Sequence, residues 1–157
     1  MGERPEAVAH PAPKGRFTIR TAGVFMVLSA IFELVSVTSG VALFGSIRVG
    51  VVAVAYHLSY SALFLAMGIG LLKAKPWTYR LVVAGTLFNT LDKLVYVMTP
   101  GTMRAELQRV MERFPQYLQL IDIDSLLPIM TALTVSFCGC WWGFVVYLHV
   151  HRAYFRR

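Results

Sequence analysis

Long apolar runs dominate the sequence and limit the folds that it can adopt. Four such runs, which charged side chains interrupt only rarely, cover residues 22–44, 49–72, 79–98 and 126–150. A helix of about 20 mostly apolar residues crosses the hydrocarbon core of a bilayer. No run alternates with the period of two that a membrane barrel strand would need. We therefore expect an all-α integral membrane protein in which four transmembrane helices form an antiparallel bundle.

The composition agrees with a membrane protein. Of the 157 residues, 57% are hydrophobic and 15% are charged, whereas soluble domains are about 45–50% apolar and about 25% charged. The net charge of +7 would suggest nucleic acid in a soluble protein. Here the basic residues lie in short tracts between apolar runs, which favours membrane topology and contact with anionic lipid. We expect the lipid bilayer, and no nucleic acid, as a partner.

The segments outside the runs predict the orientation. We expect a flexible cytoplasmic tail at 1–20, a transmembrane domain at 21–151 and a basic tail at 152–157. Ten Lys and Arg residues lie in the two tails and in the connection after the second run, against four on the opposite side of the membrane. Loops rich in Lys and Arg stay in the cytoplasm. Both termini are therefore predicted to be cytoplasmic.

The connection between the third and fourth runs is longer than the others. From about residue 102 to 119, apolar side chains recur with the helical period of 3.6 and polar ones fill the gaps. This pattern predicts an amphipathic helix at the outer membrane surface. Two roles stay open for it: it shields loop backbone, or it covers a site as a lid. Asp122 and Asp124 precede the fourth run and are expected to cap its helix.

Ionisable side chains interrupt three runs at similar depth. At about 1.5 Å per residue, Glu33 is expected near the middle of its span, while His57 and Asp92 lie in the outer half with Lys93 beside Asp92. A charge within hydrocarbon costs about 2.5–3.5 kcal/mol on insertion scales, so these groups should face the bundle interior. Asn89 shares one helix face with Asp92 and Lys93. The five residues form a candidate intramembrane polar cluster and binding site.

Two interpretations of this cluster are open. In one, Lys93 pairs with Glu33 or Asp92 and the ion pair locks the helix register. In the other, the cluster is a functional polar pocket, because ionisable residues within a membrane often mark sites. No sequence motif indicates a catalytic centre, a metal site or a cofactor, so the sequence favours no enzyme.

The leading functional expectation is therefore a small polytopic protein that acts as an accessory, assembly or scaffold component through helix–helix contacts. Gly139 and Gly143 form a G-x-x-x-G pattern that lets helices approach closely, within a homo-oligomer or against other membrane subunits. The alternative is a proton- or cation-coupled carrier or channel. Its intramembrane site would comprise Glu33, His57, Asp92 and Lys93.

Overall fold

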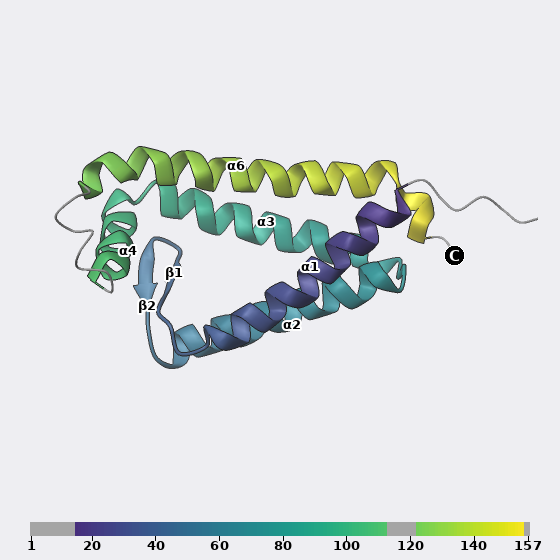
Figure 1. The fold of residues 1–157 in the computed structure, drawn as a ribbon, viewed down its shortest axis with the longest axis horizontal. Helices are drawn as coiled ribbons and strands as arrows, with labels where there is room; N and C mark the ends of the chain where they lie inside the picture. Colours follow the sequence, from purple (N-terminus) through teal and green to yellow (C-terminus); the bar gives the residue numbers. More distant parts are fainter. Residues whose placement is uncertain (1–14, 113–121, 156–157) are drawn as a thin grey trace, which may run out of the picture.

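The computed structural model of the protein describes residues 15–112 and 122–155, and it is helical apart from one short hairpin (Figure 1). The α-helices are α1 (Arg16–Val35), α2 (Val51–Leu72), α3 (Trp77–Val97), α4 (Pro100–Glu112) and α6 (Ile123–Val150). A 3-10 helix, η1 (Arg152–Phe155), follows α6. Strands β1 (Val41–Leu43) and β2 (Ser46–Arg48) pair antiparallel, with Ala42 opposite Ile47. The expectation of a helical protein is confirmed.

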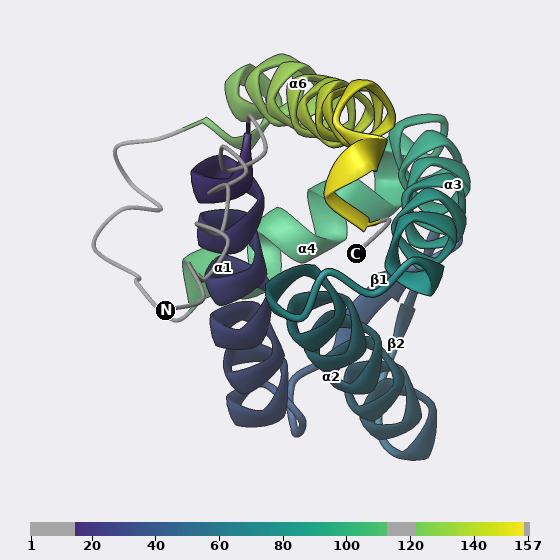
Figure 2. The ribbon, with the colours of Figure 1, turned by 90° about the vertical axis from the view of Figure 1, so that its right-hand side faces the viewer.

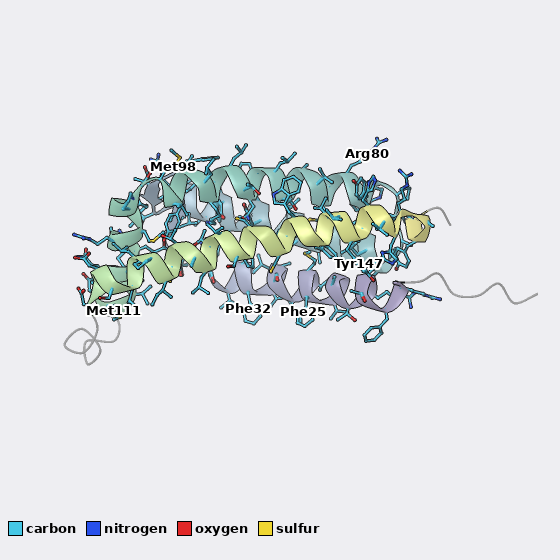
Figure 3. All side chains as sticks on the ribbon, turned by 90° about the horizontal axis from the view of Figure 1, so that it is seen from above. Phe25, Phe32, Arg80, Met98, Met111 and Tyr147 are labelled. Carbon is cyan, nitrogen blue, oxygen red and sulfur yellow. The ribbon has the colours of Figure 1, made fainter. Side chains whose placement is uncertain are left out.

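Three of the described helices, α1, α2 and α6, are long and apolar enough to cross a membrane. The number rises to four if α3 and α4 together count as one span, although a bend of 91° separates them. Large apolar side chains cover the outside of the molecule. On α1, Phe25 and Phe32 are 65% and 71% exposed and project away from the other helices (Figure 3). An apolar surface of this extent indicates a membrane protein.

The long helices pack as two pairs, α1 with α2 and α3 with α6. The pairs lie close together at the end that holds Gly15 and Phe155, which we call the termini end, and spread apart at the other (Figure 1). The β-hairpin and α4 occupy the spread end, which we call the hairpin end, and α4 lies across it (Figure 2). Because both described chain ends lie at the termini end, the chain crosses the bundle an even number of times.

An apolar core closes the termini end. Its fully buried side chains come from all four long helices: Ile19, Met67, Leu71, Val82 and Leu148. The chain folds back onto this core at η1, where the hydroxyl of Tyr154 donates a hydrogen bond of 2.8 Å to the carbonyl oxygen of Leu71. The contact gives a buried hydroxyl a partner and attaches the end of α6 to α2.

Two glycines bring the backbones of α1 and α2 together. A Cβ atom added at Gly68 would lie 2.8 Å from the carbonyl oxygen of Gly23 and 3.0 Å from the amide nitrogen of Val27. Backbone atoms cannot move aside as a flexible side chain can. Small residues permit this close packing where no hydrophobic effect drives helices together in lipid.

The structure corrects the predicted first span of 22–44 at both ends. Helix α1 begins at Arg16, within the predicted tail of 1–20, and it ends at Val35, while residues 41–48 form the hairpin. Its turn residues, Phe44 and Gly45, have φ angles of +46° and +68°. Positive φ at both positions is the geometry of a type I′ turn, whose twist matches that of paired strands. Glycine adopts this conformation readily, but phenylalanine does so rarely. The other three helices begin and end within three residues of the predicted limits.

Helix α4 starts with Pro100, a residue suited to the first helical position because its missing N–H would have no partner there. Residues 113–119 of the predicted 102–119 helix lie outside the described residues. The capping role predicted for Asp122 is confirmed: its carboxylate accepts hydrogen bonds from the Ser125 hydroxyl at 2.9 Å and the Asp124 amide at 3.2 Å. These bonds, the one from Ser125 first, hold the pKa of Asp122 below its usual range.

We expect Gly68→Ala to destabilise the protein by about 1–3 kcal/mol, because the added methyl group forces apart two backbones in contact. Thermal unfolding of the purified protein in detergent measures the effect. Gly139→Ala is the matched control, since no atom lies within 4 Å of the Cβ position there. Equal melting temperatures for the two variants would contradict the close α1–α2 contact.

Candidate functional site

A carboxylate and an imidazole connect α1 to α2. Nδ1 of His57 lies 2.7 Å from Oε2 of Glu33 in a hydrogen bond. The two side chains are only 9% and 24% exposed. One helical turn closer to the termini end, the hydroxyl of Ser61 donates a hydrogen bond of 2.9 Å to the carbonyl oxygen of Ala30. The pair therefore lies in a polar seam between two helices, at a position that the geometry of both helices defines.

The sequence predicted Glu33 near the middle of its span, but the structure places it near the end of a helix. It is two residues from the end of α1, because the chain leaves the helix after Val35. His57 is six residues from the start of α2, and Asp92 is five residues from the end of α3. All three groups therefore lie at a level close to the hairpin end, nearer that end for Glu33 than the sequence predicted.

The carboxylate of Asp92 has two partners at this level. Its side chain is fully buried, and Oδ1 accepts a hydrogen bond of 2.7 Å from the backbone amide of Phe44. Nζ of Lys93 lies 2.9 Å from Oδ2 as an ion pair, while the Lys93 side chain stays 26% exposed. The ring of Phe44 meets that of Phe88 edge-on at 5.6 Å. Asp92 therefore ties the strained turn of the hairpin to α3.

The five predicted cluster residues separate into two pairs and one single side chain. Lys93 pairs with Asp92 and not with Glu33, and Glu33 pairs with His57. Within the described residues, no hydrogen bond or ion pair connects the two pairs. The Nδ2 atom of Asn89 is buried and lacks a hydrogen-bond partner there.

Aromatic side chains separate the two pairs. The rings of Tyr56 and Tyr60 stack with centroids 4.4 Å apart, and that of Tyr60 lies 6.2 Å from Phe88 on α3. The Tyr60 hydroxyl and His57 Nε2 are buried without a described partner, like Nδ2 of Asn89. Tyr60 and Asn89 also line a cavity of about 40 Å³, which exceeds the roughly 10–15 Å³ that one water occupies. Apart from Tyr60 and Asn89, the residues that line this space are glycine and apolar or aromatic residues.

The two pairs differ in what they can do chemically. Asp92 is occupied by an ammonium group and a backbone amide, so it serves structure. The Glu33–His57 contact joins two titratable side chains, and its hydrogen bond requires a proton on one of them. His57 also has a second ring nitrogen without a partner.

We expect Asp92→Ala to destabilise the protein by about 3 kcal/mol, because it leaves the Phe44 amide and the Lys93 ammonium without their acceptor. Thermal unfolding in detergent measures the loss. Asp92→Asn should lose less, since its amide oxygen can still accept from Phe44.

The control for Asp92→Ala is Asp124→Ala, which breaks an ion pair with Arg104 whose side chains are 51% and 61% exposed. Exposed pairs contribute only about 0–1 kcal/mol. If both alanine variants unfolded at the same temperature, Asp92 would have no anchoring role.

Function has to be argued from a site, because one fold supports many activities. For this chain the site is the level of the hairpin end that holds the Glu33–His57 and Asp92–Lys93 pairs. Comparison of the chain with protein families, curated proteins and solved structures finds no match.

Proposed function

We propose that the protein is a proton-coupled membrane carrier in which Glu33 and His57 bind the transported proton. The observation that carries the proposal is the hydrogen bond of 2.7 Å between these side chains at the interface of two helices. Neither of them contacts Lys93, whose charge Asp92 balances. A carboxylate–imidazole pair without a fixed counter-ion is suited to proton exchange.

A proton can pass through this pair in one concerted step. It would bind Nε2 of His57, which faces the interior without a described partner, while the proton on Nδ1 moves to the carboxylate of Glu33. The imidazole regains its neutral state and the carboxylate becomes a carboxylic acid. Release of that proton from Glu33, which is 24% exposed, leaves the imidazole protonated on Nε2. Loss of the Nε2 proton and return of a proton to Nδ1 then restore the starting tautomer.

The packing of the two helix pairs favours a carrier over an open channel. At the termini end the path is filled by an apolar core that includes Met67, Leu71 and Leu148. A proton held at Glu33 could reach that side only after the α1–α2 pair moves relative to α3–α6. Rocking of one helix bundle against another is a common way to alternate access in transporters.

The proposal includes the placement in the membrane. All four long helices would span, with α3 as the third span, and α4 would be the amphipathic helix at the outer surface. The bend of 91° between α3 and α4 supports this, because it turns α4 away from the direction of the spanning helices. The excess of Lys and Arg at the termini end supports cytoplasmic termini. The site then opens toward the outer surface.

We expect Glu33→Gln to reduce proton flux by roughly 100-fold, because an amide cannot accept the proton from His57. Flux is measured in proteoliposomes that contain a pH-sensitive dye, with a potassium gradient and valinomycin to supply the driving potential. His57→Gln should have the same effect, and both variants should unfold near the wild-type temperature.

Two controls separate proton transfer from a structural role. Ser61→Ala removes a hydrogen bond between the same two helices without removing a titratable group. Glu112→Gln removes an exposed carboxylate from α4. Both should keep the wild-type flux. If Ser61→Ala abolished flux as Glu33→Gln does, the pair would only hold the helices together.

The second candidate is the accessory, assembly or scaffold role, and one observation favours it. Among the 28 residues of α6, only Val145 and Leu148 are buried. Gly139 and Gly143 have open space within 4 Å of their Cβ positions. The face that carries this G-x-x-x-G pattern is therefore available to a helix of a second copy or of another subunit.

Under this second candidate, native mass spectrometry in mild detergent should find an oligomer that Gly143→Ile converts to monomer, because the larger side chain blocks close approach. The matched control is Leu133→Ile, at an exposed position of the same helix. A wild-type protein that is monomeric and carries no other subunit would exclude the scaffold role.

A further inference from the structure

A polar cleft lies at the hairpin end, outside the site described above. Helix α4 forms one wall, and the β-hairpin with the turn before it forms the other. The cleft measures about 170 Å³, and its lining residues are Ser39, Gly40, Ala42, Ile47, Glu106, Arg109 and Val110. This volume is below the range of about 300–1,000 Å³ for pockets of drug-sized ligands, so the cleft suits a small molecule or one headgroup.

Two opposite charges line the cleft without neutralising each other. Glu106 and Arg109 are three residues apart on α4, a spacing at which side chains can meet. They nevertheless form no ion pair, and within the described chain neither side chain pairs with any other charged group. The cleft therefore presents a carboxylate and a guanidinium side by side to a ligand.

The carboxylate of Glu106 is held in place, and the exposed guanidinium of Arg109 lies beside the turn. The buried hydroxyl of Tyr96 donates a hydrogen bond of 2.6 Å to Oε2 of Glu106, which leaves Oε1 for a ligand. Nη1 of Arg109 would lie 2.9 Å from a Cβ atom at Gly40, so the guanidinium rests against the backbone of the turn. Groups oriented in advance lose less conformational entropy when they bind.

We propose that this cleft binds a small zwitterion of the phosphoethanolamine type. Its phosphate contacts Arg109, since a guanidinium matches the geometry of phosphate oxygens and stays charged at every physiological pH. Its ammonium group contacts the open oxygen of Glu106. The ligand is either the headgroup of a phosphatidylethanolamine lipid or a soluble phosphoethanolamine, since both carry the same charged groups.

The lining of the cleft favours a primary ammonium group over a quaternary one. Sites for quaternary ammonium surround the cation with aromatic rings, and none of the described residues that line this cleft is aromatic. A primary ammonium group instead has N–H donors for the Glu106 carboxylate. The placement also fits a headgroup, because α4 lies across the end of the helix bundle (Figure 2).

Two assays test the proposal on the full-length protein. Thermal unfolding in detergent after removal of co-purified lipid is measured with phosphoethanolamine, phosphocholine, ethanolamine or inorganic phosphate added. Native mass spectrometry measures binding of phosphatidylethanolamine and of phosphatidylcholine. We expect phosphatidylethanolamine to bind at least about tenfold more tightly than phosphatidylcholine, the effect of one charge-assisted hydrogen bond. A ligand that binds the folded state raises the melting temperature.

Variants assign the binding to the cleft. Arg109→Gln and Glu106→Gln should each weaken binding by about tenfold or more; the glutamine at 106 keeps an acceptor for Tyr96, so the fold is preserved. Arg104→Gln removes a charge from another face of α4 and should bind as the wild type does.

The results distinguish the sources of the ligand. A melting shift with phosphoethanolamine supports recognition of the headgroup alone, whereas selective lipid binding without that shift supports the lipid-anchored form. Equal effects of inorganic phosphate and phosphoethanolamine would overturn the zwitterion site, as would equal binding of the two lipids. Unchanged binding by Arg109→Gln would remove the cleft as the site.

Discussion

At the hairpin end of the bundle, the carboxylate of Asp92 accepts the backbone amide of Phe44 and balances the charge of Lys93. A carboxylate buried without such partners would be strongly unfavourable, and so would a buried amide without an acceptor. The hairpin therefore keeps its place by satisfying Asp92, and Asp92 stays buried because the hairpin is there. Helix α4 depends on the same arrangement, because the hydroxyl of Thr102 donates to the carbonyl oxygen of Gly45 in the turn. The polar cleft between α4 and the hairpin follows from this contact.

Each of the two buried pairs joins a carboxylate to a basic side chain, but the two pairs differ in their other partners. Asp92 has two partners that belong to the fold: Oδ1 accepts the hydrogen bond from the Phe44 amide, and Oδ2 lies in an ion pair with Lys93. Glu33 and His57 bind mainly each other, and one ring nitrogen of His57 has no described partner. The partners of Asp92 are a backbone amide and a lysine, whereas Glu33 and His57 are two titratable side chains in one hydrogen bond. This contrast is the physical basis for assigning structure to one pair and proposing proton transfer for the other.

The distribution of polar groups along the bundle supports the same division. At the termini end, apolar side chains from four helices pack into one core. At the hairpin end, the helix pairs diverge (Figure 1). There the rings of Tyr60 and Phe88 meet between α2 and α3, and the backbone amide of Phe44 reaches Asp92. Divergence makes room for polar side chains and for the hairpin, and convergence closes the opposite end. Both sites inferred for this protein lie at the hairpin end for that reason.

Much of the fold could be predicted from the sequence because apolar length and period are local properties. The runs at 49–72, 79–98 and 126–150 correspond closely to α2, α3 and α6, and the cap at Asp122 lies where its sequence pattern predicted. Counting residues along the predicted first span placed Glu33 near its middle, whereas α1 ends two residues after it. The hairpin could not be predicted, because residues 41–44 continue an apolar run and only Gly45 signals a turn.

The tertiary structure determines which charged groups pair with each other. Depth alone allowed Lys93 to reach either Glu33 or Asp92. The choice depends on how α1 rotates against α2, which the contact of Gly23 with Gly68 constrains, and on the hairpin amide that reaches Asp92. The sequence by itself determined that helices in a membrane must bury these charges, since each unpaired charge is costly in hydrocarbon. Only the tertiary structure decided which partners neutralise them, because those partners come from segments far apart in the chain and meet through packing.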